Sequence, residues 1–227
     1  IAPLSVLLLM VASYWDSRHR IPASSGYLWE FLTQQTFIIW GLLMLPLFIT
    51  LETALLGGLE HEGDHWKQVF AQPTPRLAIY LAKQLMALIV IGLSMLALAG
   101  LTGLLGLGLQ AILPDMIIDA PFPWQQLLRY AGCTYVAAWL IVSLHTWVGL
   151  RWKSFVVAMA VGIVMTVAGV LVIQSQYGPY YPWAAAGLAV SRLNEGNSPM
   201  IPVLVGLIGG PIVALLGAWD VNRRDVL

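Results

Sequence analysis

Long apolar segments recur along almost the whole chain, separated by polar or Pro/Gly-rich breaks. About 20 apolar residues are enough for a helix to cross the hydrocarbon core of a bilayer. The segments do not alternate as the strands of a membrane barrel do, so each is predicted to be a helix that satisfies its own backbone hydrogen bonds. They are residues 1–14, which is shorter than a full span, 29–59, 77–109, 125–150, 154–174 and 199–219.

This pattern predicts an all-α polytopic membrane protein: one domain, residues 1–227, built as a six-transmembrane-helix bundle whose first helix is truncated at residue 1. The composition agrees, since 59% hydrophobic and 10% charged residues cannot cover a water-soluble surface. Equal numbers of basic and acidic residues, 11 of each, give no electrostatic footprint for nucleic acid. The single Cys133 lies in an apolar run and cannot form an internal disulfide.

The distribution of Lys and Arg predicts the orientation of the chain, because cytoplasmic segments are enriched in these residues. If the segment 60–76 is cytoplasmic, the outside keeps only Arg18, Arg20, Arg129 and Arg192. Both termini are then predicted to be cytoplasmic. The outer segments are rich in Pro and aromatic residues, notably 177–183, which is typical of an interfacial belt or of short re-entrant pieces. The cytoplasmic basic residues would be Lys67, Arg76, Lys83, Arg151, Lys153, Arg223 and Arg224.

The polar segment 60–76 interrupts two of the longest apolar runs, and its first residues suggest one kind of chemistry. His61, Glu62 and His65 satisfy H-E-x-x-H, in which two imidazoles bind zinc and the Glu activates a water. Gly63 would weaken the required helix by about 1 kcal/mol relative to Ala. No third ligand is evident, so a membrane-embedded zinc metalloprotease stays an alternative and no bound metal is expected.

An interfacial helix over about 60–72 explains more of this segment. Trp66, Val69 and Phe70 fall at i, i+3 and i+4 and form one apolar stripe. Such a helix would lie on the cytoplasmic headgroups between the second and third spans and could transmit force from a partner. The third span then begins with Thr74 as cap and Pro75 at the first helical position.

These features resemble the permease subunits of type-two ATP-binding-cassette exporters, in particular the bacitracin and lantibiotic self-protection branch. The resemblance covers the six-span topology, an acidic residue near the end of the second span, a short polar helix with Trp-Lys, a Pro-x-x-Arg start and an early Lys in the third span. In this sequence the features are Glu52 or Glu60, Trp66-Lys67, Pro73-Thr74-Pro75-Arg76, Lys83 and the outer Tyr181-Pro182-Trp183.

The resemblance implies that the segment is a coupling helix that docks on a separate P-loop nucleotide-binding subunit. ATP and Mg would be held by that subunit, since no G-x-x-x-x-G-K-[ST] loop occurs here and the chain is not expected to be catalytic. The expected partners are also a second permease copy or a homologous permease, and membrane lipids. The expected location is the cytoplasmic membrane of a bacterium. Candidate coupling residues are Glu60, Glu62, Asp64, Trp66, Lys67, Phe70, Pro73 and Arg76.

Two further sets of residues are candidates for tuning transport. A carboxylate in a span needs a partner, so Glu52 is predicted to pair with Arg76 or Lys83 at the elbow between the second and third spans. Polar groups at membrane depth either line a path or bond a neighbouring helix. The candidates for a translocation path are Gln34, Gln35, Gln84 and His145. A membrane scaffold without transport activity is the remaining alternative.

Overall fold

The computed structural model describes residues 12, 27–61, 75–112, 121–152 and 154–223. These residues form helices and connecting turns, which confirms the all-α prediction for the part of the chain described. The elements are α2 (Tyr27–Ile39), the π-helix η1 (Trp40–Met44), α3 (Leu45–His61), α5 (Arg76–Ile112), α6 (Trp124–Arg151), α7 (Phe155–Val172), the 3-10 helix η4 (Gly178–Tyr180), α8 (Pro182–Asn194) and α9 (Met200–Arg223).

Among the described residues, five stretches of helix are long and apolar enough to cross a membrane, and they match the second to sixth predicted spans. The predicted segment 1–14 lies, apart from residue 12, outside the described residues, so a count of six stays a prediction. The five stretches are Trp29–Gly58, Leu77–Ala111, Trp124–Arg151, Phe155–Val172 and Met200–Arg223.

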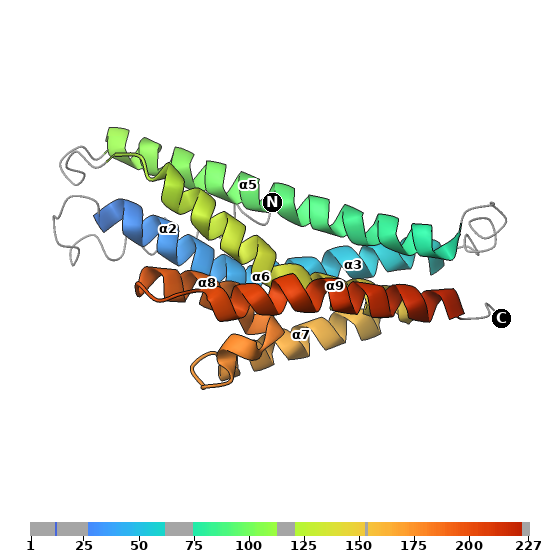
Figure 1. Ribbon diagram of the computed structural model, residues 1–227. Helices are drawn as coiled ribbons and strands as arrows, with labels where there is room; N and C mark the ends of the chain where they lie inside the picture. The colour runs from blue at the N-terminus through green and yellow to red at the C-terminus, as the bar shows by residue number, and fades with distance from the viewer. Residues whose placement is uncertain (1–11, 13–26, 62–74, 113–120, 153, 224–227) are drawn as a thin grey trace.

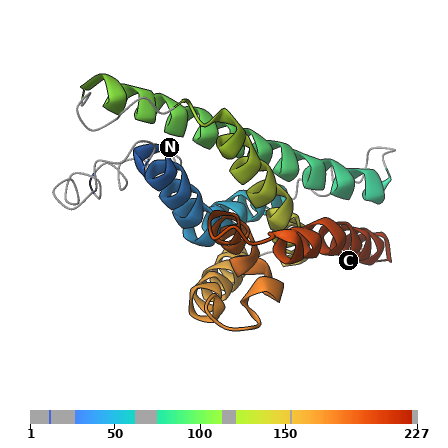
Figure 2. The same cartoon turned by 60° about the vertical axis from the view of Figure 1, so that its left-hand side comes forward.

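The long helices run along one common axis, as both ribbon views show (Figures 1 and 2). The end of α3, the start of α5 and the end of α9 lie together at one end, which is on the right in Figure 1. We call this the basal end. The start of α2, the end of α5 and the start of α6 lie at the opposite end, which we call the distal end. The two helices that flank the segment 62–74, α3 and α5, thus meet at the basal end.

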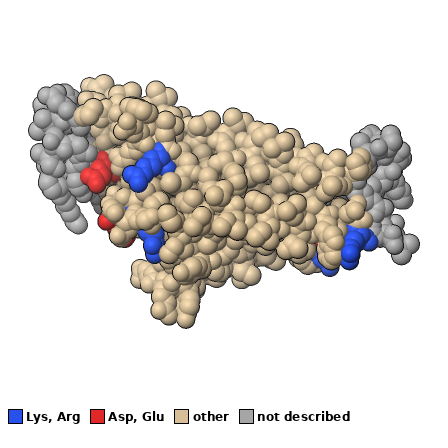
Figure 3. Space-filling model, in the orientation of Figure 1, with Lys and Arg blue, Asp and Glu red and all other residues tan. Residues whose placement is uncertain are grey.

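The surface of the bundle is apolar between its two ends. On the face in Figure 3, the charged side chains lie toward the two ends. Large apolar side chains stand exposed between them, for example Val156 at 71%, Leu171 at 78% and Leu215 at 68%. A water-soluble protein does not expose so continuous an apolar surface, whereas lipid covers it without cost. The chain is therefore a multi-pass membrane protein.

A π-helical turn interrupts the span formed by α2 and α3. The N–H of Leu45 bonds to the carbonyl of Trp40, five residues earlier. Pro46 follows at once, has no N–H of its own, and its ring would clash with the carbonyl of Leu42 in a regular helix. The wider turn gives that ring room. Neither hydropathy nor residue spacing had predicted this turn.

Helix α8 is a second feature that the span prediction did not include. It starts with Pro182 at its first position, which suits a residue without an N–H. Its small residues, including Ala185, Ala186 and Gly187, let it pack closely against its neighbours, with Gly187 directly on Leu42 of η1. The expectation of short re-entrant pieces between the last two spans thus has a counterpart in a buried helix of 13 residues.

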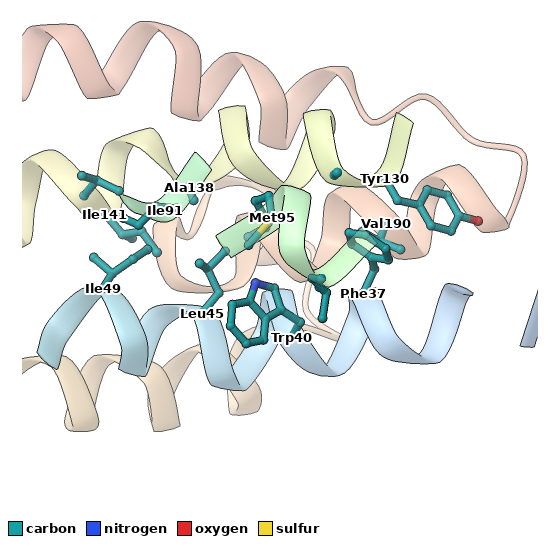
Figure 4. Packing of buried hydrophobic residues seen from close by; sticks show 14 of the residues in the cluster. Phe37, Trp40, Leu45, Ile49, Ile91, Met95, Tyr130, Ala138, Ile141 and Val190 are labelled. Atoms are coloured by element: carbon teal, nitrogen blue, oxygen red, sulfur yellow. The ribbon is translucent and has the colours of Figure 1, made fainter. Parts of the chain in front are cut away.

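The core of the bundle lies where α2, η1, α3, α5 and α6 meet (Figure 4). Trp40 and Leu45 project from the two sides of the π-turn toward Met95 of α5. Small residues bring α9 onto α6, since a β-carbon at Gly206 or Gly210 would collide with the α6 backbone near Val136 or Trp139. Glycine at these two positions thus lets the two helices approach closely.

Candidate functional site

The basal end carries the attachment points of the predicted coupling segment, and four helices are tied together there. We call the residues that make these ties the basal cluster. They are Leu56 and Gly57 of α3, Tyr80 and Lys83 of α5, Trp147, Gly149 and Arg151 of α6, and Gly217 and Asp220 of α9.

A hydrogen bond from a side chain of α5 to the backbone of α3 ties these two helices together. The ammonium group of Lys83 donates to the carbonyl of Leu56 at 2.6 Å. That carbonyl lies in the last turns of α3, close to the residues whose carbonyls have no partner within the helix. A cation near a helix C-terminus is also favoured by the helix dipole. Lys83 therefore holds together the two helices that flank the segment 62–74.

Glu52 lies one helical turn before Leu56 on α3. Both of its carboxylate oxygens are buried and accept no hydrogen bond from the residues that the structure describes. Lys83 reaches the neighbouring turn, whereas the side chain of Arg76 lies outside the described residues. The predicted pairing of Glu52 with Lys83 or Arg76 is thus not present among the described contacts and stays a prediction.

The tie between α6 and α9 is polar. Asp220 accepts the indole N–H of Trp147 at 2.8 Å and a forked contact from Arg151 at 3.1 and 3.2 Å. Trp147 and Arg151 stand four residues apart on α6 and so share one face. Since the carboxylate joins both, it fixes the last turns of α9 against α6.

The ties between α3 and α6 and between α5 and α9 depend on glycine. Gly57 and Gly149 face each other so closely that a β-carbon on Gly149 would lie 2.6 Å from the carbonyl oxygen of Thr53. Gly217 likewise leaves room for the phenol of Tyr80. Together with the hydrogen bonds, these contacts make α3, α5, α6 and α9 one packed unit at the basal end.

Most predicted coupling residues belong to the segment attached to this unit and lie outside the described residues: Glu62, Asp64, Trp66, Lys67, Phe70 and Pro73. Glu60 and His61 end α3, and Arg76 begins α5, with side chains that are likewise outside the description. The carbonyl of Pro75 accepts the N–H of Ala78 at 2.9 Å, so α5 starts one residue later than the sequence predicted.

A buried polar group lies deeper in the bundle, around His145. The indole N–H of Trp183 on α8 donates to Nε2 of His145 at 3.2 Å, and the two rings meet edge to face at 5.6 Å. Thr50 of α3 touches the same nitrogen at 3.4 Å, while its hydroxyl donates to the carbonyl of Pro46 at 2.8 Å. His145 therefore joins α3, α6 and α8.

The four candidate path residues do not form one cluster. Gln84 donates to Ser143 at 2.8 Å and so bonds a neighbouring helix, two residues from His145 on α6. Gln34 and Gln35 are half-buried on α2. Sixteen residues of helix separate Gln34 from Thr50, which is about 24 Å at 1.5 Å per residue.

Sequence reasoning missed Asp220 and Trp183. Asp220 had a signal, because it is an acidic residue close after the last predicted span, and Trp147 and Arg151 offer donors at a spacing of four. Trp183 belonged to the Tyr181-Pro182-Trp183 feature of the family resemblance, but nothing there pointed to His145 as its partner. Among the described residues, no group of three His, Cys, Asp or Glu side chains could hold a metal ion. Glu62 and His65 lie outside that description.

Long apolar helices with exposed apolar sides, tied together by polar contacts at the basal end, define a multi-pass membrane protein. Residues 1–169 match the family model described as ABC-2 family transporter protein. The chain therefore belongs to this family and is an ABC-2 type permease, the membrane subunit of a transporter whose ATP is bound by an associated subunit. No curated protein and no solved structure matches the chain. The match lends no support to the zinc protease or the scaffold.

Proposed function

We propose that the chain is the permease of a bacterial exporter that moves a hydrophobic or amphiphilic compound, such as an antimicrobial peptide, a drug or a lipid. A separate P-loop subunit hydrolyses ATP and docks on the coupling helix at about 60–72. The basal end and both termini face the cytoplasm, and two permease copies, or this chain and a homologue, form the pathway. The bacitracin and lantibiotic branch is the one whose motifs the sequence resembles most.

The packing of the basal cluster is the observation that carries this proposal. A docking segment transmits force only if the helices on both sides of it are held to the rest of the bundle. Here Lys83 joins α3 to α5, Gly57 and Gly149 join α3 to α6, and Asp220 joins α6 to α9. A displacement of the segment 62–74 therefore acts on four helices as one body.

The polar group around His145 is the place deeper in the bundle to which this displacement would be transmitted. Thr50 lies on the same helix as Leu56, so a tilt of α3 moves its contact with His145. Trp183 carries that movement to α8, which reaches toward the distal end. ATP-driven motion at the basal end would in this way open or close the bundle at the far side.

The apolar stripe of the coupling segment provides the test. Trp66→Asp and Phe70→Asp should abolish assembly with the ATPase, or leave ATP hydrolysis uncoupled from transport, because a charged stripe cannot dock in an apolar groove. Gln68→Asn changes a polar position of the same helix and serves as the control. The measurements are co-purification with the ATPase, ATP hydrolysis and export by reconstituted vesicles.

Two outcomes would overturn the proposal. One is wild-type export by both Asp variants. The other is the reproducible failure of any P-loop ATPase to co-purify with the chain from native membranes. An adjacent reading frame that encodes such an ATPase would be independent support.

A further inference from the structure

A cleft at the distal end is not used by the proposed coupling mechanism. It opens between the end of α7, the end of α8 and the start of α9, and its volume is about 600 Å³, within the range of small-molecule sites. Its lining combines apolar residues with charged and hydroxyl-bearing ones. Its characteristic lining residues are Ile173, Leu188, Arg192, Glu195, Ser198 and Ile201.

The cation in this cleft has no protein counterion in the described part of the chain. Arg192 is half-buried on the last turn of α8, and within those residues its guanidinium group makes no hydrogen bond and no ion pair. The group keeps five donors in a planar fork that matches the oxygens of a phosphate. A half-buried guanidinium beside apolar walls favours an anionic ligand group.

The carboxylate in the cleft is held in place by other residues. Glu195 accepts the hydroxyl of Ser191 at 3.0 Å and the amide N–H of Asn197 at 3.1 Å. Each carboxylate oxygen keeps a free lone pair after these bonds. The carboxylate is therefore oriented in advance and can accept hydrogen bonds from a ligand cation.

A helix-ending motif fixes the position of both charges. Gly196 has φ of 72°, and its N–H bonds to the carbonyl of Leu193 at 3.3 Å. The N–H of Asn197 bonds to the carbonyl of Arg192 at 2.8 Å. These two bonds form a Schellman motif, which stops α8 with Arg192 inside the last turn and Glu195 at its end.

Two serines add donors on the remaining polar side. The hydroxyl oxygen of Ser175 accepts the N–H of Tyr177 at 3.2 Å, and that of Ser198 accepts the N–H of Met200 at 3.3 Å. Their own hydroxyl hydrogens have no acceptor in the region that the structure covers. Both serines line the cleft and can donate to phosphate oxygens.

The apolar surroundings indicate that the ligand also has acyl chains. Leu171 at the end of α7 is 78% exposed, and Met200 at the start of α9 is 62% exposed. Tyr177 and Tyr180 stand exposed in the turn beside them, as aromatic residues do at the level of lipid headgroups. The cleft thus lies where the apolar surface ends.

We propose that this cleft binds a zwitterionic aminophospholipid, with the phosphate at Arg192, the ammonium group at Glu195 and the acyl chains along α7 and α9. The cation of Arg192, which has no counterion among the described residues, and the separately held carboxylate of Glu195 match the two charges of phosphatidylethanolamine. Phosphatidylcholine has no N–H to donate to Glu195, and phosphatidylglycerol has no cation. This site does not depend on the transported compound or on which way the chain is oriented.

Native mass spectrometry of the purified full chain in detergent, with each of these three lipids added at equal concentration and with identical acyl chains, tests the site. Wild type should retain phosphatidylethanolamine in preference to the other two. Arg192→Gln should weaken its retention about tenfold, as expected for losing a charge-assisted hydrogen bond. Glu195→Gln should abolish the preference over phosphatidylcholine.

Matched controls come from the same end of the bundle. Arg129→Gln and Glu30→Gln remove one exposed cation and one exposed carboxylate outside the cleft and should leave retention unchanged. Equal retention of the three lipids by wild type would overturn the proposal, and so would unchanged retention in both cleft variants. Binding of soluble glycerophosphoethanolamine as tight as that of the lipid would overturn the part that assigns the acyl chains.

Discussion

The indole N–H of Trp183 donates a hydrogen bond of 3.2 Å to Nε2 of His145 and so joins the short helix α8 to the long helix α6. An indole nitrogen only donates, so Nε2 must accept and the ring hydrogen of a neutral imidazole is on Nδ1. Nδ1 has no partner among the described residues. One hydrogen bond therefore selects the tautomer of a buried histidine and fixes the inner end of α8.

Replacing this indole tests its contribution to the bundle. Trp183→Phe keeps an aromatic ring but removes the donor, and should lower the free energy of unfolding by about 1–3 kcal/mol, because Nε2 is left buried without a donor. Thermal unfolding in detergent measures the change. Trp124→Phe, at an indole that is 57% exposed, is the control and should have little effect. Equal effects of the two substitutions would contradict the assigned hydrogen bond.

The bond from Lys83 to Leu56 should matter more for coupling than for folding. Lys83→Met keeps the length of the side chain but removes the donor that joins α5 to α3. We expect export to fall severalfold while the partner still hydrolyses ATP, as measured in reconstituted vesicles. Lys83→Arg retains a donor and should retain most of the export. Wild-type export by Lys83→Met would show that this bond transmits no force.

Asp220 offers a way to separate an ion pair from a hydrogen bond. Asp220→Asn loses the charge but still accepts the N–H of Trp147. It should lower the free energy of unfolding by about 0.2–1 kcal/mol, since Arg151 is partly exposed. Asp220→Leu also leaves the indole without an acceptor, and should lower the free energy of unfolding by about 1–3 kcal/mol more than Asp220→Asn. Thermal unfolding of the two variants gives the comparison. An equal loss in both would assign the whole effect to the charge.

Two adjacent glycines of α3 should respond in opposite ways to the same substitution. Gly57→Ala places a methyl group against the backbone of Gly149, and this overpacking should lower the free energy of unfolding by about 1–3 kcal/mol. Gly58→Ala meets no atom within 4 Å and should be neutral or stabilise the helix by up to about 1 kcal/mol. The unfolding temperatures of the two variants, compared with that of the wild type, measure both effects. If Gly58→Ala were the more damaging, the close crossing of α3 and α6 would be wrong.

The end of α8 depends on the left-handed backbone of Gly196. Gly196→Ala should lower the free energy of unfolding by about 1–2 kcal/mol, because a β-carbon disfavours that conformation. Gly196→Asn should cost less, since Asn tolerates it better than other residues. Thermal unfolding measures both variants. The Schellman motif would be contradicted if the two substitutions had the same small effect.

The sequence was sufficient to predict the spans because length and apolar content determine them. The second predicted span, 29–59, corresponds to the helical stretch Trp29–Gly58, and the last, 199–219, to Met200–Arg223, which continues beyond the predicted end. The π-turn at 40–44 was not predictable from hydropathy, which is as high in a π-turn as in an α-helix. Pro46 was its one visible signal, and it also fits a simple kink.

The candidate site was predictable only where its residues are close in sequence or typical of a family. The segment 60–76 is a candidate for both reasons, and its role as a coupling helix stays a prediction. The contacts of Asp220 with α6 and of Trp183 with His145 join positions 69 and 38 or more residues apart, and a single sequence contains no signal for such pairings. The sequence left the partner of Glu52 open between Arg76 and Lys83, and the described contacts include no partner for it.

The π-turn leaves a phase shift in the sequence of its span. Buried pairs of residues recur every four positions before it, at 32–33, 36–37 and 40–41, and again after it, at 45–46, 49–50 and 53–54, with a single step of five between the two sets. Deleting one residue within 40–44 would restore an even repeat and keep both faces turned inward. Deleting one elsewhere in the span would rotate the remainder by about 100°. The turn thus has the form of a one-residue insertion that the fold has absorbed without losing its core.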